Sequence, residues 1–145
     1  MFTSPPYYNT EIYSEDKQDS SNFKSYEEFL DWYEIVFQQA VARLKTNRFL
    51  VVKIGEGRRD NKGFFYNLVG DSISCFLKLD LKLYNTAVLL TKKWTAAQRV
   101  RRQFPNYRKL ASTHQTLLCF FKVDTDKAIP QEIGILSEKE YGEVE

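Results

Sequence analysis

The chain has 145 residues, which is enough for one domain with a single core and too few for two independent domains. Hydrophobic residues make up 43% and charged residues 28% of the sequence, a composition that excludes an intrinsically disordered protein. The formal net charge of +2 is too small to indicate nucleic-acid binding by itself, so that function depends on where the cations cluster.

The chain begins with a conformationally restricted proline-rich segment, Ser4-Pro5-Pro6-Tyr7. Consecutive prolines stop a helix, fix the backbone and remove N–H donors, so carbonyl oxygens are left to face an incoming amino group. Tyr7 adds an aromatic ring that can stack on a flat heterocycle. Taken alone, so short a match is more often a proline-rich turn than a site.

Two helices are predicted after this segment and the polar loop that follows it. Ser25 and Glu28 match a capping box, which predicts a helix over about residues 26–45. Its apolar residues recur at spacings of three and four and predict one buried stripe. The stripe consists of Phe29, Leu30, Tyr33, Val36, Phe37, Ala40, Val41 and Leu44.

The same spacing predicts a second helix over residues 64–78, in which Gly70 weakens the helix without ending it. Its stripe consists of Phe65, Leu68, Val69, Ile73, Phe76 and Leu77.

Three strands are also predicted. Residues 49–54 form a nearly continuous apolar run, as expected of a strand buried on both faces of a parallel sheet. Residues 82–91 and 115–122 are rich in branched and aromatic side chains, which favour strands. Helices that alternate with strands indicate an α/β fold. We expect one domain over residues 1–124, followed by a polar tail over residues 125–145.

A basic insertion over residues 92–113 separates the last two strands and contains no acidic residue. Its cations and interleaved aromatics are Lys92, Lys93, Arg99, Arg101, Arg102, Arg108, Lys109, Trp94, Phe104 and Tyr107. A connection of this length is usually functional or mobile. Contact with DNA and a merely solvated loop explain this composition equally well.

Residues 4–7 resemble the catalytic motif Asp/Asn/Ser-Pro-Pro-Tyr/Phe of exocyclic-amino DNA methyltransferases, the N6-adenine and N4-cytosine enzymes of phage and bacterial type. The resemblance extends in order along roughly residues 2–124. It includes Tyr8 to Asn22, Arg48-Phe49, the turn Arg59 to Gly63, Leu83-Tyr84-Asn85, Arg108-Lys109 and His114-Gln115.

This resemblance implies a partial Rossmann-like, S-adenosylmethionine-dependent methyltransferase fold. The chain would be the C-terminal catalytic half, with about strands four to seven and without strands one to three. The Phe-x-Gly-x-Gly donor-binding turn of the family is not found in the sequence. A second polypeptide that binds the donor, or a homo- or hetero-oligomer, is therefore expected. The alternatives are a truncated remnant and a non-catalytic DNA- or RNA-binding subunit.

The resemblance assigns the catalytic role to Ser4, Pro5, Pro6 and Tyr7. Tyr7 would stack on a base flipped out of the duplex, while Ser4 and the Pro5 carbonyl would accept hydrogen bonds from its amino group. The chemistry needs no metal. Serine at the first motif position occurs in N4-cytosine and in N6-adenine enzymes, so the target base stays open.

Further contacts are expected around this motif. The substrate-binding candidates are Tyr8, His114, Arg99, Arg101, Arg102, Arg108 and Lys109. A lone histidine beside a strand is more often a packed or surface residue than a catalytic one. Ser4 and Gly55 are the candidates for the edge of the S-adenosylmethionine site. Gly55 begins a loop that lacks the later glycine and the lysine of nucleotide-binding fingerprints.

Cys75 and Cys119 lie in apolar runs and predict buried free thiols in a reducing compartment. The sequence has no apolar stretch of about 18 residues and no export signal at its start. These features predict a cytoplasmic protein. Members of the resembled family serve DNA methylation and restriction-modification.

Overall fold

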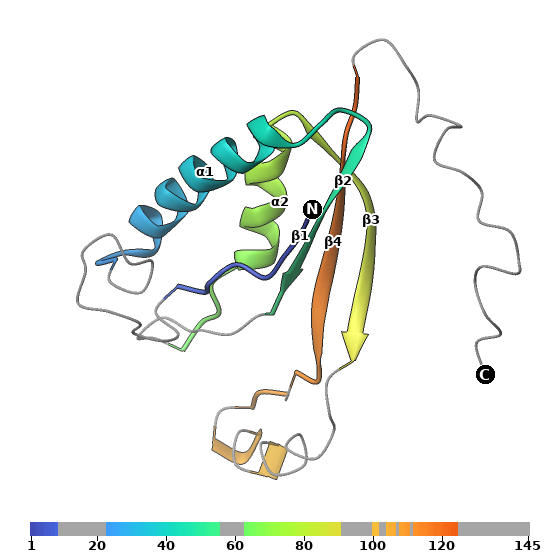
Figure 1. The fold of residues 1–145 in the computed structure, drawn as a ribbon. Helices are drawn as coiled ribbons and strands as arrows, with labels where there is room; N and C mark the ends of the chain where they lie inside the picture. Colours follow the sequence, from blue (N-terminus) through green and yellow to red (C-terminus); the bar gives the residue numbers. More distant parts are fainter. Residues whose placement is uncertain are drawn as a thin grey trace, which may run out of the picture.

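The structure, a computed structural model, describes residues 1–8, 23–55, 63–90, 100–101, 104–106, 108–110 and 112–124. The elements in chain order are β1 (Phe2–Thr3), α1 (Tyr26–Arg43), β2 (Arg48–Ile54), α2 (Leu68–Lys78), β3 (Leu81–Leu90) and β4 (His114–Lys122). The strands form one sheet in the order β1-β2-β4-β3, and α1 and α2 lie together on one side of it (Figure 1). The predicted α/β class is confirmed. None of the helices in these ranges is long and apolar enough to cross a membrane.

The sheet is mixed rather than parallel, which corrects the prediction for residues 49–54. β2 is parallel to β1 but antiparallel to β4. Burial along β2 also alternates, because Leu50, Val52 and Ile54 are fully buried whereas Phe49 and Val51 are only partly buried. One face of β2 is therefore covered by the helices, and the prediction of a strand buried on both faces is wrong.

The two faces of the sheet carry different side chains. The helix face consists of Leu50, Val52, Ile54, Leu118 and Phe120, which are all fully buried against α1 and α2. The opposite face consists of Phe49, Val51, Tyr84, Cys119 and Phe121. On it, the Phe49 ring lies 5.2 Å from the ring of Tyr84 and 4.9 Å from that of Phe121, measured between centroids.

Helix α1 begins at Tyr26 as predicted. The Ser25 hydroxyl accepts a hydrogen bond from the Glu28 amide at 3.1 Å. The helix ends at Arg43 because Leu44 is extended and the Lys122 ammonium donates to the carbonyls of Val41 and Leu44, each at 2.7 Å. Four stripe residues are buried: Phe29, Tyr33, Phe37 and Val41. Val36, by contrast, is 39% exposed, so its predicted place in the stripe is wrong.

Helix α2 begins at Leu68 rather than at residue 64, because the Asn67 side chain caps it by accepting from the Gly70 amide at 3.3 Å. A Cβ atom at residue 70 would collide with that Asn67 side chain, so glycine makes room for the cap. Phe65 and Leu77 are exposed, contrary to the predicted stripe.

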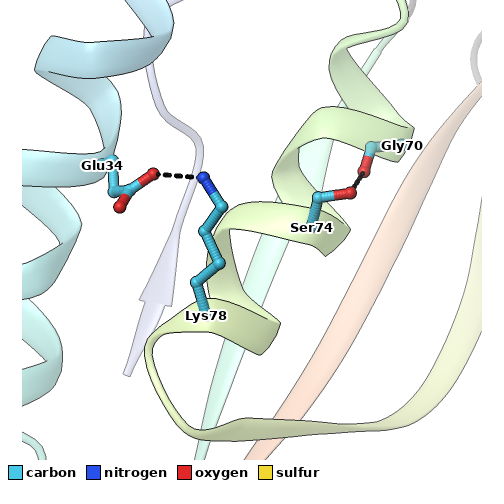
Figure 2. Close-up of polar contacts among 4 residues, drawn as sticks. All are labelled: Glu34, Gly70, Ser74 and Lys78. Atoms are coloured by element: carbon cyan, nitrogen blue, oxygen red, sulfur yellow. Dashed lines mark hydrogen bonds and ion pairs between the residues drawn. The ribbon is translucent and has the colours of Figure 1, made fainter.

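Two surface contacts of α2 are drawn in Figure 2. Lys78 forms an ion pair with Glu34 of α1 at 3.0 Å, and the Ser74 hydroxyl donates to the Gly70 carbonyl one turn earlier at 3.1 Å. Between the helices, the buried Ser72 hydroxyl donates to the Tyr33 hydroxyl at 3.2 Å. A polar contact thus lies inside the core as well as at its rim.

Candidate functional site

The motif, the end of β2 and the basic insertion lie at the same end of the sheet. The register pairs Thr3 with Val52, and Ile54 with Thr116. It also pairs Leu90 with His114 across β3 and β4. Residues 4–7, Gly55 and the insertion therefore all leave the sheet at the same end, which is the carboxyl end of β1 and β2 (Figure 1). Open α/β sheets bind their ligands beyond this end of the strands.

Tyr7 is tied to this end of the sheet by its hydroxyl group. The Gly55 amide donates to the Tyr7 hydroxyl oxygen at 3.0 Å, and the Gln115 side-chain amide donates to the same oxygen at 3.4 Å. The ring is partly buried and packs against the core below it. The motif is thereby joined to the ends of β2 and β4.

The other motif residues present polar atoms at the surface. Ser4 is exposed, and its hydroxyl donates to the Lys53 carbonyl at 3.4 Å, so the lone pairs of the oxygen are left to accept. Pro5 is buried and Pro6 is exposed. Burial of Pro5 fixes the backbone between the serine and the tyrosine.

Tyr8 belongs to the core, with only 8% of its surface exposed. Its ring lies 5.6 Å from that of Tyr26, 5.7 Å from that of Phe29 and 5.2 Å from that of Tyr66. The Tyr26 hydroxyl donates to the Asp71 carboxylate at 2.8 Å. Burial, followed by this hydrogen bond, raises the pKa of Tyr26 well above its ordinary value. A packed layer of aromatic rings, Tyr8, Tyr26, Phe29 and Tyr66, therefore supports the motif.

The basic insertion is described only in part, and Arg99 and Arg102 lie outside the described residues. Arg101 and Arg108 are exposed, and the Arg108 guanidinium lies 5.7 Å from the centre of the Phe104 ring. Lys109 is partly buried instead. Its ammonium donates to the Gly63 carbonyl and lies 5.3 Å from the centre of the Phe65 ring. Lys109 thus joins the insertion to the segment before α2.

His114 and Gln115 are neighbours on β4, and successive strand residues point to opposite faces. Gln115 reaches Tyr7, so His114 points to the other side of the sheet, where it is exposed. Gln115 is missing from the sequence-based list of site residues. Its position next to the histidine, on a strand whose start was already predicted, is the signal that could have identified it.

The sequence matches the model of the N6_N4_Mtase family, described as DNA methylase, over residues 1–142. The chain belongs to this family. The match confirms the resemblance seen at residues 4–7 and extends past residue 124. No curated protein matches the sequence.

Solved DNA methylases share the fold. TTHA0409 of Thermus thermophilus, itself only provisionally assigned as a DNA modification methylase, matches at a TM-score of 0.59 and 18% identity, over 90% of this chain and 48% of that one. Its complex with S-adenosyl-L-methionine gives a TM-score of 0.57 at 19% identity, over 89% and 49% of the two chains. The cytosine-N4-specific PvuII DNA methyltransferase gives 0.57 at 17% identity, over 85% and 41%. This DNA methylase chain therefore has part of a methyltransferase fold and spans less than half the length of these proteins.

Gly55, the predicted edge of the donor site, lies next to Gln115 and Tyr7. A Cβ atom at Gly55 would lie 3.4 Å from the Gln115 amide nitrogen and 3.5 Å from the Tyr7 hydroxyl. A Cβ atom there would therefore make only ordinary contacts, and the role of Gly55 at the donor site remains a prediction. No Phe-x-Gly-x-Gly turn occurs elsewhere in the sequence.

Proposed function

We propose that this chain forms the base-binding part of a DNA methyltransferase that modifies the exocyclic amino group of adenine (N6) or cytosine (N4). The observation that carries the proposal is the position of the Ser4–Tyr7 motif. It lies at the carboxyl edge of the sheet, where Gly55 and Gln115 hold the tyrosine. The family match and the shared fold support the same reaction class.

Each motif residue has one task in this proposal. Tyr7 stacks on the flipped-out base through its ring, since its hydroxyl is already hydrogen-bonded to the Gly55 amide. Ser4 and the Pro5 carbonyl accept hydrogen bonds from the amino group, which directs the nitrogen lone pair away from the ring of the base. The lone pair would then form the new N–C bond while the methyl–sulfur bond breaks and its electron pair stays on the sulfur, and the amino proton would leave to water. The chain supplies alignment rather than a covalent intermediate.

S-adenosylmethionine, when bound, supplies an electrophilic methyl group on a sulfonium. We propose that its main binding site lies in the donor-binding half, either on a second polypeptide or elsewhere in a longer chain. DNA is the other partner, and the exposed Arg101 and Arg108 are candidates for phosphate contacts. We place this activity in the cytoplasm and in DNA modification of the bacterial or phage restriction-modification type.

The experiment is methyl transfer to DNA from a methylation-deficient strain, with S-adenosylmethionine and a polypeptide that carries the donor-binding half. Mass spectrometry of the digested DNA measures N6-methyladenine and N4-methylcytosine and so identifies the target base. Tyr7→Ala is expected to lower the rate by roughly 5- to 150-fold, which is the range of one lost aromatic–base stack. Loss of the hydroxyl alone should lower the rate by no more than about tenfold, so a larger fall reports the loss of the ring.

Tyr84→Ala is the matched control, because it removes an exposed tyrosine from β3, far along the sequence from the motif. It is expected to leave the rate within twofold. An active wild type whose rate is unchanged by Tyr7→Ala would contradict the proposal. If the chain bound DNA but transferred no methyl group with any donor-binding polypeptide, a non-catalytic binding subunit would be favoured. If it neither bound DNA nor transferred a methyl group, a truncated remnant would be indicated.

A further inference from the structure

Gln115 makes a contact that connects the two ends of the described chain. Its side-chain amide donates to the Tyr7 hydroxyl at 3.4 Å, across 108 positions of sequence. The Gly55 amide donates to the same oxygen at 3.0 Å. These three groups come from the segment after β1, the end of β2 and the start of β4, so the contact closes the edge of the sheet.

The two donors determine what the Tyr7 hydroxyl can do. A phenolic oxygen accepts at its lone pairs, and both acceptor positions are taken by Gly55 and Gln115. The hydroxyl is therefore not free to take a proton from an amino group. Since the ring is held at its backbone and also at the far oxygen, it cannot swing about its first side-chain bond.

We propose that Gln115 is a positioning residue that holds the Tyr7 ring in the orientation required for stacking on the target base. This inference rests on the proposed function of Tyr7. The anchor is a feature of this chain, because the family motif accepts phenylalanine, which has no hydroxyl. Stacking on the base needs only the ring of Tyr7. The hydrogen bonds to its hydroxyl fix the orientation of that ring.

The first test is a double-mutant cycle on the unfolding of the 145-residue chain in urea, with Tyr7→Phe, Gln115→Leu and the double variant. The two single changes remove the same hydrogen bond, so their effects should not add. The expected coupling is a roughly two- to tenfold change in the unfolding equilibrium constant, as for one net hydrogen bond. Gln39→Leu, on the exposed surface of α1, is the matched control and should show no coupling with Tyr7→Phe. Additive effects of Tyr7→Phe and Gln115→Leu would overturn the inference.

The second test is kinetic and uses the protein assembled with its donor-binding half. Gln115→Leu is expected to lower kcat about five- to tenfold while KM for DNA stays within twofold, because phosphate contacts dominate DNA affinity. Gln115→Glu should recover most of the rate, since its carboxylate can accept the hydroxyl proton of Tyr7. In the Tyr7→Phe background, Gln115→Leu should cause no further loss.

The outcomes separate this inference from the proposed function. An active enzyme whose kcat is unaffected by Gln115→Leu would overturn the positioning role, even if the cycle shows coupling. A wild type that transfers no methyl group with any donor-binding half would instead overturn the proposed function. A Gln115→Glu variant as poor as Gln115→Leu would show that packing, not the hydrogen bond, is what matters, and would also overturn the inference.

Discussion

The two faces of the sheet differ in how completely they are covered. On the helix face, Leu50 and Phe120 have no exposed surface, and the Phe120 ring lies 4.7 Å from that of Phe76 in α2. On the opposite face Phe121 is buried, but Phe49 and Cys119 are only partly buried and Tyr84 is 50% exposed. The helix face therefore forms a fully buried, closely packed core. The opposite face contributes less to stability, although the same strands build both.

Substitutions at neighbouring positions of β2 test this contrast most strongly. Leu50→Ala should destabilise the chain by about 2 to 5 kcal/mol, because the fully buried side chain leaves a cavity under the helices. Phe49→Ala should cost less, about 1 to 2 kcal/mol, since part of the ring is already exposed to water. Urea unfolding of the two variants measures both values. Equal losses would mean that the opposite face is as well packed as the helix face.

The two cysteines report on the same contrast, since Cys75 lies in α2 above the helix face and Cys119 lies on the opposite face. Both thiols are free. Burial raises the pKa of the Cys75 thiol to about 11, so little thiolate exists there at neutral pH. A thiol reagent at about pH 8 should modify Cys119 at least about tenfold faster than Cys75. Cys75→Ala and Cys119→Ala assign the two rates, and faster labelling of Cys75 would show that the helix layer opens easily.

The buried thiol also predicts a loss of stability in alkali. The pKa of Cys75 is raised by burial from 9.0 to about 11, so between these values the native state binds more protons than the unfolded chain. This contribution is complete below pH 9 and is lost as the pH rises to about 11. Burial raises the pKa of Tyr33 as well, which extends the decline to higher pH. Urea midpoints against pH should fall more gently between 9 and 11 for Cys75→Ala, and identical slopes would contradict the assignment.

Local sequence signals were sufficient for both helices and for three of the four strands in the described residues, but not for β1 or for every helix boundary. The capping box at Ser25 placed the start of α1 correctly, because the hydrogen bond involved spans one turn. The end of α1 depends on Lys122, which comes from β4 and is invisible to any local pattern. The prediction of a parallel sheet for β2 failed for the same reason, because the pairing direction depends on a strand that is distant in the sequence. An apolar run is typical of a parallel strand, but only the partner strand decides its direction.

The candidate site, too, could be predicted from the sequence only where its residues are contiguous. The proline-rich motif is contiguous and could be recognised, whereas the anchors of Tyr7 come from Gly55 and Gln115, far along the chain. The adjacent residues Tyr7 and Tyr8 also differ in burial. Tyr7 lies at the edge, while Tyr8 is buried among rings of α1 and of the segment before α2. The resemblance placed Tyr7 in the catalytic motif and Tyr8 among the substrate contacts, and only packing shows how differently the two side chains lie.

The smallest expected effect concerns the rim of the helix layer, where Lys78 of α2 pairs with Glu34 of α1 (Figure 2). The two side chains are 66% and 41% exposed, so water screens their attraction. Lys78→Ala should leave the free energy of unfolding almost unchanged, and addition of salt should reduce even the small remaining effect. Urea unfolding at low and high salt measures both effects. A loss comparable to that of Leu50→Ala would mean that the ion pair, rather than the apolar helix face, fixes the two helices to each other.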